Sequence, residues 1–513
     1  MPARLNGTDP SESNGHHTNG QDLHGSQLRG RLVIASNRGS IEHTFDEQGR
    51  LSRRCASGGV ATALASFPGA LPITWVASAV TPAERSLAAA GKPVGLRRSQ
   101  RLRLVAPPQT AYDLYYGTFC NPILWFLQHS IAGELQRPAF EREAWEAWEQ
   151  GYLPVNRAFA ESVADELAPI SGPRQVMLHD YHLYAAPPLI RRLVPDARLQ
   201  HFIHIPWPAP PAWELLPRPI VESILRGLLA NDSVVFQTRT WADYFLRTCD
   251  AFLPDASVSW DDGSVEFAGR QVRVWVNPIT VDAGDLQAQL ASPEALSYQE
   301  ALQPELGERT IVRVDRLDPA KNVLAGFRAY DRMLDQHPEW RGRARFLAFL
   351  VPTRPRVEEY RSYAREVFDL ISDINARHGR AGWQPITVFH EHNRLQALAA
   401  MSLYDVLLVN PLRDGMNLVS KEGPAVNQRD GVLVLSVGAG AFAELGGHAL
   451  PVLPDDVDGT ARALHIALSM PLAERRSRAA RLRQLVEERT LGDWLRLLLD
   501  DLATSPLGEP ALV

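Results

Sequence analysis

From Arg31 onward the sequence alternates between short apolar runs and longer stretches with helical periodicity, and this alternation limits the possible folds strongly. Apolar runs joined by helices are typical of parallel β-strands that are covered on both faces. The runs of the first half are residues 31–37, 73–77, 175–179, 199–204 and 233–237. Those of the second half are residues 310–314, 344–350, 386–389, 404–410 and 432–436. Two such series predict an α/β protein with two Rossmann-like domains.

The first series is predicted to form an N-terminal domain at residues 30–280. Its last elements are a hairpin around Asp262 and Gly263 and a strand at 272–279. A long helix is predicted earlier, over 142–167, whose aromatic side chains fit a core better than a cofactor site.

The second series is predicted to form a C-terminal domain at residues 281–485. Residues 486–513 follow as a final segment with a short tail. The helix predicted there, over 491–502, is long enough to cross back to the N-terminal domain and tie the two domains together.

The first 29 residues differ from the rest of the chain in composition. They are rich in Gly, Ser, Asn, His and Asp and contain almost no large apolar side chains. Such a segment cannot bury enough apolar surface to offset the entropy of ordering it. Residues 1–29 are therefore predicted to be a disordered tail.

Charge and cysteine content argue against several classes of protein. A formal net charge of −6 over 513 residues gives no field that would attract nucleic acid or an anionic membrane. Cys55, Cys120 and Cys249 show no CxxC spacing, so no disulfide framework or zinc site is indicated. We find no signal-peptide pattern and no run of about 18 apolar residues. We expect a cytoplasmic protein without a membrane or nucleic-acid partner, and a homo-oligomer stays open.

The segment PLRDGMNLVSKE, residues 411–422, carries the strongest functional signal. It follows a buried strand, and ligands of open α/β sheets bind where such strands end. Gly415 permits a tight turn, and the amides of 416–418 open a helix whose N-terminus favours a phosphate. Asp414 and Glu422 add carboxylates that suit sugar hydroxyls. The segment predicts a sugar-nucleotide site.

Two other segments bring phosphate-directed groups to strand ends. RLDPAK places Arg316 and Lys321 after a strand, where two cations match a leaving nucleotide diphosphate. The loop at 57–60 contains Gly59 before a helix of small residues, which suits a diphosphate held by backbone amides. Arg38 comes just after the first strand and is expected to reach the cleft that this loop borders.

Two motifs invite other interpretations. Histidines cluster in HDYHL and in HIPWP at strand ends, but no third ligand sits at metal spacing on one element, so no metal site is predicted. The sequence DVDGT from Asp456 matches the signature of aspartate-nucleophile phosphatases. Too little chain follows for such a domain, so a turn and a helix N-cap are predicted instead.

Taken together, these segments resemble the trehalose-6-phosphate synthases of glycosyltransferase family 20. The shared motifs are SNR, SGG, YYGTFCNPILW, HDYHL, HIPWP, RLDPAK and LRDGMNLVSKE, in that order between Arg31 and about Leu502. The resemblance implies a GT-B fold, in which the parallel sheets of two Rossmann-like domains face a central cleft. The donor would bind in the C-terminal domain and the acceptor in the N-terminal one.

The resemblance also implies roles for individual residues. The catalytic set would be His204, Asp414, Arg316 and Lys321. Donor-binding residues would be Gly59, Arg316, Lys321, Asp414, Gly415, Met416, Asn417, Leu418 and Glu422. Acceptor-binding residues would be Arg38, Trp75, Tyr116, Trp125, Asp180 and Arg354.

The implied reaction moves glucose from UDP-glucose or GDP-glucose to glucose 6-phosphate, with retention, and gives α,α-trehalose 6-phosphate. The family is thought to use same-face attack within an ion pair rather than a carboxylate nucleophile. The departing diphosphate then takes the acceptor proton, and no metal or other cofactor is needed.

Two departures leave alternatives open. Asn393 stands where UDP-using members carry an aromatic residue near the base. Gly423 and Pro424 are expected to interrupt the helix after Glu422, because proline cannot donate a backbone hydrogen bond. A glucosylglycerol-phosphate synthase, a cyclitol pseudo-glycosyltransferase and a catalytically silent sugar-phosphate sensor therefore remain alternatives.

Overall fold

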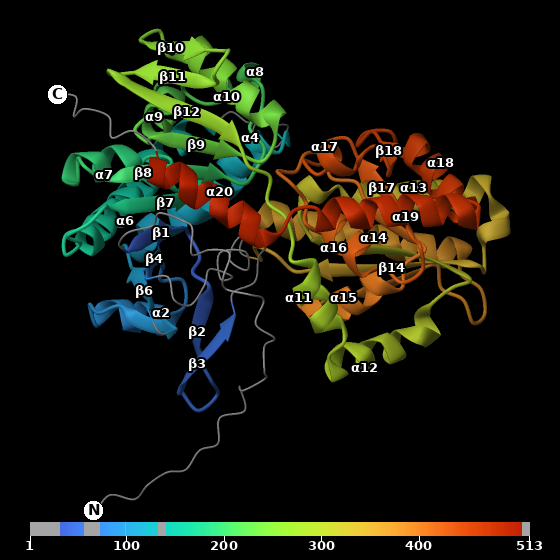
Figure 1. Cartoon of the computed structure of the whole chain (residues 1–513). Helices are drawn as coiled ribbons and strands as arrows, with labels where there is room; N and C mark the ends of the chain where they lie inside the picture. The colour runs from blue at the N-terminus through green and yellow to red at the C-terminus, as the bar shows by residue number, and fades with distance from the viewer. Residues whose placement is uncertain (1–30, 56–71, 98, 132–139, 356, 505–513) are drawn as a thin grey trace, which may run out of the picture.

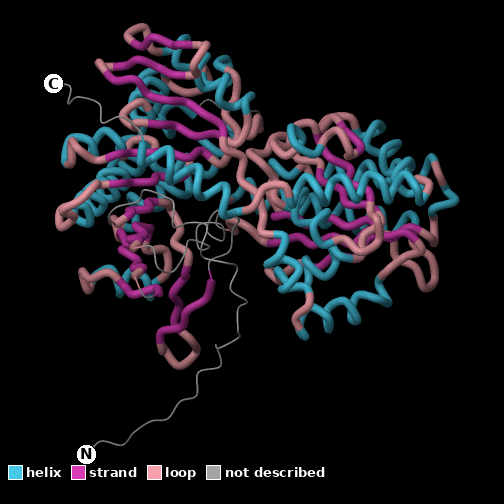
Figure 2. The backbone as a smooth tube through the Cα atoms, viewed as in Figure 1, coloured by secondary structure: helices cyan, strands magenta, loops and turns pink. Residues whose placement is uncertain are grey.

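The chain folds into two lobes, each built around one β-sheet (Figure 1). The structure is a computed structural model and describes residues 31–55, 72–97, 99–131, 140–355 and 357–504. The predicted tail at 1–29 and the predicted phosphate loop at 57–60, with Gly59, lie outside the described residues. The lobes lie side by side, with strands at the centre of each and helices around them (Figure 2).

The N-terminal lobe contains a sheet in the order β10-β11-β12-β9-β8-β7-β1-β4-β6-β5. From β12 to β6 all neighbours are parallel, and antiparallel pairs close both edges. Its strands are β1 (Leu32–Ala35), β4 (Ile73–Ser78), β5 (Val94–Arg97), β6 (Gln100–Val105), β7 (Gln175–His179), β8 (Arg198–Ile203), β9 (Ser233–Phe236), β10 (Ala256–Ser259), β11 (Ser264–Phe267) and β12 (Arg270–Val276). A separate hairpin pairs β2 (Ile41–Phe45) with β3 (Leu51–Cys55).

Helices cover both faces of this sheet because its central strands are buried on both sides. They are α2 (Pro82–Ala89), α3 (Gln109–Leu114), η1 (Tyr115–Leu124), α4 (Trp125–Gln128), α5 (Phe140–Ala147), η3 (Trp148–Tyr152), α6 (Leu153–Leu167), η4 (Tyr181–Leu183), α7 (Pro187–Leu193), α8 (Pro210–Trp213), α9 (Arg218–Leu228) and α10 (Arg239–Phe252). Of these, η1 and η3 are π-helical and η4 is a 3₁₀ turn.

The C-terminal lobe contains a fully parallel sheet in the order β15-β14-β13-β16-β17-β18. The strands are β13 (Arg309–Arg316), β14 (Ala344–Val351), β15 (Ile386–Phe389), β16 (Val406–Val409), β17 (Val432–Ser436) and β18 (Leu450–Val452). The helices are α11 (Ala283–Leu290), α12 (Pro293–Leu302), η5 (Gln303–Glu305), η6 (Pro319–Lys321), α13 (Val323–Gln336), η7 (Pro338–Trp340), α14 (Glu358–His378), α15 (Arg394–Ser402), α16 (Val419–Val426), α17 (Phe442–Leu445), α18 (Val457–Ser469) and α19 (Leu472–Glu487). The final helix, α20 (Leu491–Thr504), packs on the other lobe. None of the described helices has both the length and the apolar character that a membrane crossing requires.

The predicted strands all form, and the GT-B arrangement is confirmed. The long helix predicted over 142–167 differs, because a π-helical segment, η3, divides it. Gly151 in η3 lies against the start of the π-helix η1, where an added Cβ would lie 2.6 Å from the backbone nitrogen of Tyr115. The two π-helical segments therefore pack closely and fix where the next residue, Tyr116, is held.

The expected interruption of the helix after Glu422 is wrong. Helix α16 runs through Gly423 and Pro424 to its end at Val426. The turn around the proline closes because the N–H of Asn427 donates to the carbonyl of Gly423 at 2.9 Å. Only the single bond that Pro424 cannot donate is lost.

Helix α20 crosses back to the N-terminal lobe, as predicted. It follows α19, which packs on the C-terminal lobe, and then lies along β8 (Figure 1). The indole of Trp494 donates to the carbonyl of Asn277 at 3.2 Å, and the Asn277 amide donates back to the carbonyl of Trp494 at 3.1 Å. Near the end of the helix, the buried carboxylate of Asp501 accepts from Ser233 Oγ at 2.6 Å.

This docking predicts a large stability cost for Trp494→Ala. The side chain is fully buried, and removing a buried tryptophan costs about 3–5 kcal/mol. The matched control is Leu497→Ala on the same helix, where the side chain is 44% exposed and the expected change is below about 0.5 kcal/mol. Urea unfolding followed by circular dichroism measures both. Equal midpoints for the two variants would show that α20 is not part of the folded core.

Candidate active site between the two lobes

The lobes come into backbone contact where the segment 411–422 leaves β16. Gly415 lies directly against the carbonyl oxygen of His204, the residue that follows β8 in the other lobe. An added Cβ at Gly415 would collide with that oxygen. The glycine is therefore required by the approach of the N-terminal lobe, in addition to any ligand.

Asp414 holds two polar partners on its own lobe. Lys321 Nζ forms a close ion pair with Asp414 Oδ2, and Asn417 Nδ2 donates to the same oxygen at 3.0 Å. Burial by itself would raise the pKa of this carboxyl, but the Lys321 cation holds the pKa below its ordinary value. Asp414 is therefore a carboxylate that accepts hydrogen bonds.

A second buried carboxylate, Asp318, connects the two lobes. On the N-terminal lobe, the indole of Trp125 donates to Oδ1 at 3.2 Å. On the C-terminal lobe, Arg354 and Arg316 reach Oδ2 at 3.1 and 3.4 Å. Burial favours the neutral acid, but the two guanidinium groups lower the pKa of Asp318 below its usual value.

The predicted ribose ligand, Glu422, lies on α16 and is mostly buried. Arg394, the first residue of α15, reaches its Oε1 at 3.1 Å. The neighbouring Lys421 points inward, where Nζ donates to the carbonyl of Ile279 at 2.8 Å and pairs with Glu444 at 2.9 Å. Helix α16 is thus anchored to the chain segment that joins the two lobes.

The predicted acceptor-phosphate residues surround one histidine, His182 of η4. The ring of Tyr116 stacks on it with centroids 6.2 Å apart. Burial, together with the positive charges of Arg354 and Arg38, lowers the pKa of His182 to about 3. Arg38 lies nearer to solvent and pairs with Glu42 at 3.1 Å. The three predicted side chains therefore lie around one buried histidine.

Arg354 is buried among aromatic rings. Its guanidinium lies 4.1 Å from the ring centroid of Trp125 and 4.9 Å from that of Tyr360, and donates to the hydroxyl of Tyr181 at 3.4 Å. Burial would lower its pKa, yet the tyrosines and Asp318 raise the pKa above its usual value. The structure thus brings Arg354 to the interface of the lobes.

Trp75 and Asp180 occupy different positions relative to the cleft. Trp75 is buried in the core within β4, and its indole donates to Ser36 Oγ at 2.7 Å. It therefore supports the turn formed by the SNR motif, residues 36–38, from the core side. Asp180 follows β7 and accepts from the backbone N–H of His204 at 3.3 Å. Burial raises the pKa of Asp180 to about 7, although backbone N–H groups partly offset this effect.

Part of the backbone strain in the described residues lies at this site. Asp180, Arg354 and Asn417 have positive φ, at 70°, 47° and 75°, and they are three of the seven described non-glycine residues that do. Strained residues are common at functional sites, where the surrounding structure imposes the conformation.

Sequence reasoning did not single out Asp318 and His182. For Asp318 a signal was available, because the Asp-Pro pair of RLDPAK indicates a capping carboxylate after a strand. His182 lies two residues after Asp180 in HDYHL, and nothing in that spacing alone indicates a buried ring.

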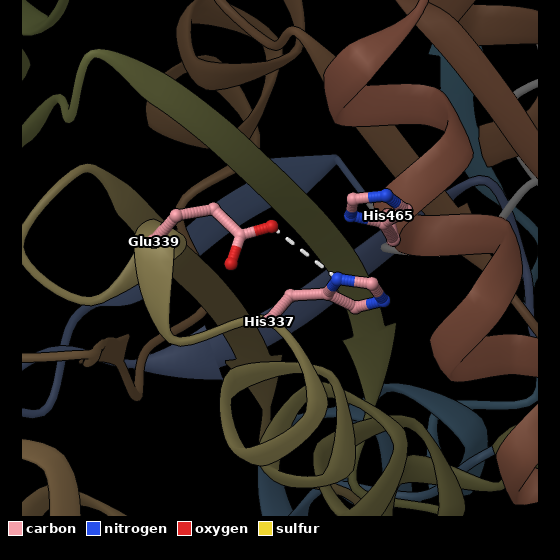
Figure 3. Close-up of side chains that lie close together, drawn as sticks. All are labelled: His337, Glu339 and His465. Atoms are coloured by element: carbon pink, nitrogen blue, oxygen red, sulfur yellow. Dashed lines mark ion pairs between the residues drawn. The ribbon is translucent and has the colours of Figure 1, made fainter.

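Two groups of side chains in the described part of the chain have the spacing of metal ligands, and neither was predicted. Figure 3 shows one of them: His337 directly follows α13, Glu339 lies in η7 and His465 lies on α18. Trp340 Nε1 donates a hydrogen bond to His465 Nδ1 at 3.1 Å. A metal-bound histidine usually does the opposite, because its free ring N–H donates to an acceptor that orients the ring.

The other group consists of Asp331, Asp335 and His378, and an arginine of the protein forms an ion pair with it. Arg377 pairs with Asp331 at 2.8 Å. Neither group contains a residue of the predicted site.

The DVDGT motif forms a helix cap, as predicted. Asp456 Oδ1 accepts from the backbone N–H of Gly459 at 2.7 Å and begins α18. This contact uses the carboxylate that a phosphatase would need as its nucleophile.

Comparison with known proteins places these features in context. The family model of Glycosyltransferase family 20 matches residues 30–504. The UDP-forming α,α-trehalose-phosphate synthase of Schizosaccharomyces pombe is 32% identical over 478 residues, which are 90% of this chain and 88% of the relative. The bifunctional trehalose-6-phosphate synthase/phosphatase of Thermoproteus tenax is 34% identical over 480 residues, and the match spans 62% of that longer relative.

Solved structures agree with the sequence comparison. A structure described as trehalose-6-phosphate from E. coli bound with UDP-2-fluoro glucose has a TM-score of 0.78 at 29% identity and covers 92% of this chain and 99% of its own. An α,α-trehalose-phosphate synthase (UDP-forming) from Burkholderia xenovorans, in complex with glucose-6-phosphate, has a TM-score of 0.79 at 29% identity. The match covers 92% of this chain and 100% of the other.

The contact between the lobes predicts that Gly415→Ala opens the cleft. The added methyl group would overlap the carbonyl oxygen of His204. This oxygen belongs to the backbone, so it can move away only if the two lobes separate. We expect a larger radius of gyration in small-angle X-ray scattering with unchanged circular dichroism. Gly447→Ala is the control, because no atom lies within 4 Å of the Cβ it would add. Identical scattering from both variants would mean that the lobes do not meet at Gly415 in solution.

Proposed function

Because this chain belongs to glycosyltransferase family 20, we propose that it transfers glucose from a nucleotide-glucose donor to glucose 6-phosphate and forms α,α-trehalose 6-phosphate. The observation that carries the proposal is the pairing of two sets of groups across one cleft. On the C-terminal lobe, Lys321 pairs with Asp414 and Arg316 pairs with Asp318, at or just after the carboxyl ends of β13 and β16. Across from them, Arg38 and Tyr116 lie near Arg354 around His182.

The charges suit a leaving diphosphate. Arg316 and Lys321 would stabilise the negative charge that develops as the sugar–oxygen bond breaks, and the N-terminus of α16 would add backbone donors. Asp414, held ionised by Lys321, would accept hydrogen bonds from sugar hydroxyls. We propose that these groups suffice without a metal ion.

Retention follows from attack on the face that the diphosphate leaves. In this scheme the C–O bond to the diphosphate breaks, and the anomeric hydroxyl of glucose 6-phosphate forms the new bond from the same side. Its proton passes to the departing phosphate oxygen. A strong protein base is therefore unnecessary, which agrees with the burial that lowers the pKa of His204 well below its usual value.

For the donor base we propose uracil, because the family relatives are named as UDP-forming. Asn393 does not decide against it. Its side chain caps α15 by accepting from the N–H of Gln396 at 3.0 Å, and its amide donates to the hydroxyl of Tyr298 at 2.8 Å. Both contacts are structural.

Other readings of the site are less well supported. A silent sensor would be expected to have lost charged groups at the cleft, whereas Arg316, Lys321 and Asp414 are all present and paired. A glucosylglycerol-phosphate synthase or a cyclitol pseudo-glycosyltransferase would keep the same phosphate-binding residues, so the acceptor must be tested directly. A cytoplasmic location and a homo-oligomer stay predictions.

A panel of substrates tests the proposal. Purified protein would be assayed with UDP-, GDP- and ADP-glucose against glucose 6-phosphate and glycerol 3-phosphate. We expect the fastest turnover with UDP-glucose and glucose 6-phosphate. Turnover only with glycerol 3-phosphate would move the chain to the sister activity, and no turnover with any pair would favour the sensor.

Replacing one leaving-group cation tests the mechanism. Arg316→Ala should lower kcat by about a hundredfold or more, because loss of one donor to a developing charge has effects of that size. Arg343→Ala is matched in exposure, 48% against 43%, and in having a carboxylate partner, Glu308. It should keep full activity. Near-normal turnover by Arg316→Ala would remove this residue from the proposed mechanism.

A further inference from the structure

A chain of buried hydrogen bonds lies behind His204 and runs to the segment that joins the lobes. Gln237, one residue after β9, accepts from the backbone N–H of Ile279 at 2.8 Å through Oε1. Its Nε2 lies 3.2 Å from His204 Nδ1. On the other side of the ring, His204 Nε2 lies 3.0 Å from His179 Nδ1. All three side chains are at least nine-tenths buried.

The direction of each bond follows from the first one. A backbone N–H can only donate, so the group of Gln237 that faces Ile279 must be the carbonyl oxygen. The amide NH₂ then faces His204, and NH₂ can only donate. Nδ1 of His204 must therefore be the unprotonated, accepting nitrogen.

A neutral His204 consequently carries its proton on Nε2. Burial, together with the nearby rings of His179 and His201, keeps the imidazole neutral by lowering its pKa. The Asp180 carboxyl faces the backbone N–H of His204 instead. In this structure the Nε2–H donates to His179 Nδ1, so the proton of His179 sits on its own Nε2.

We propose that Gln237 is a positioning residue that keeps His204 in the Nε2–H tautomer, so that His204 offers a hydrogen-bond donor to a hydroxyl of the transferred sugar. The role rests on the proposed function, since it assumes that His204 contacts the donor sugar. His179 is then the resting partner of the Nε2–H, and the sugar oxygen replaces it when the donor binds.

The same residue, Ile279, is also held from the C-terminal lobe by helix α16. While its N–H fixes Gln237, the carbonyl of Ile279 accepts from Lys421 Nζ at 2.8 Å. Lys421 lies on α16 directly before Glu422, the predicted ribose ligand. The orientation of His204 in one lobe therefore depends on a residue, Ile279, that helix α16 of the other lobe holds in place.

Nitrogen NMR of the histidine rings tests the tautomer directly. In protein labelled with ¹⁵N-histidine, a nitrogen with a proton and one without have well-separated shifts, and the His204 signals are those missing from His204→Gln. We expect the proton on Nε2 in the wild-type protein without ligand. A proton on Nδ1 overturns the proposal, whatever the variants do.

Two substitutions then separate positioning from packing. Gln237→Glu keeps an acceptor for Ile279 but cannot donate to His204, so the Nδ1 of His204 should become protonated. Gln237→Met removes both bonds at similar volume, and both tautomers should appear. In both variants we expect kcat/KM for the donor to fall about tenfold, with KM for glucose 6-phosphate unchanged within about twofold.

Gln200→Met is the matched control. Gln200 is a buried glutamine of the same sheet that donates to the carbonyl of Leu498 on α20 at 3.1 Å. This variant should lose stability but keep the wild-type His204 signals and donor kinetics. If Gln237→Met also keeps both, or if Gln200→Met shifts the His204 tautomer equally, the proposal is wrong. If the wild-type enzyme transfers no glucose, the proposed function fails while the tautomer result still stands.

Discussion

The buried carboxylate of Asp318 is the interaction on which the arrangement of the cleft depends. A charge removed from water must be paired and hydrogen-bonded, or it forces the structure apart. Asp318 finds its partners in both lobes, with the indole of Trp125 on one side and the guanidinium of Arg354 on the other. Neither lobe alone supplies this set of partners, so the buried carboxylate favours the arrangement in which the two lobes are in contact. The backbone contact between Gly415 and His204 uses the same approach.

The cations predicted to hold substrate phosphates each lie against a carboxylate in this structure. Lys321 pairs with Asp414, and Arg316 and Arg354 pair with Asp318. Arg38, nearer to solvent, pairs with Glu42. The positive charge at the site is thus already partly balanced within the protein, since Arg316 and Arg354 share the single carboxylate of Asp318. An arriving diphosphate or phosphate exchanges one anionic partner for another, which lowers the net gain from charge and makes geometry decide the selectivity.

The fold was predictable because its signal is local. Each central strand reads as a short apolar run, and strands such as β7, β15 and β17 begin and end at the predicted residues. The hairpin β2–β3 and the strands β5, β6 and β18 were not predicted, since they are partly exposed and lack a continuous apolar run. Asp318 and Gln237 were missed for another reason. Their partners lie far away in sequence, and no local spacing records a contact between Asp318 and Trp125.

The crossing helix α20 also has a consequence for how the protein is made. Helix α20 packs along β8, and its Trp494 is buried against the N-terminal lobe. About 290 residues of chain separate the end of β8 from the start of α20. At bacterial and eukaryotic rates of synthesis, the ribosome needs roughly 15–60 s to cover that distance. Throughout this interval the nascent first lobe exposes an apolar surface that only the end of the chain can cover. The lobe that begins folding first is therefore completed last, and a truncated or stalled chain would carry that surface into the cell.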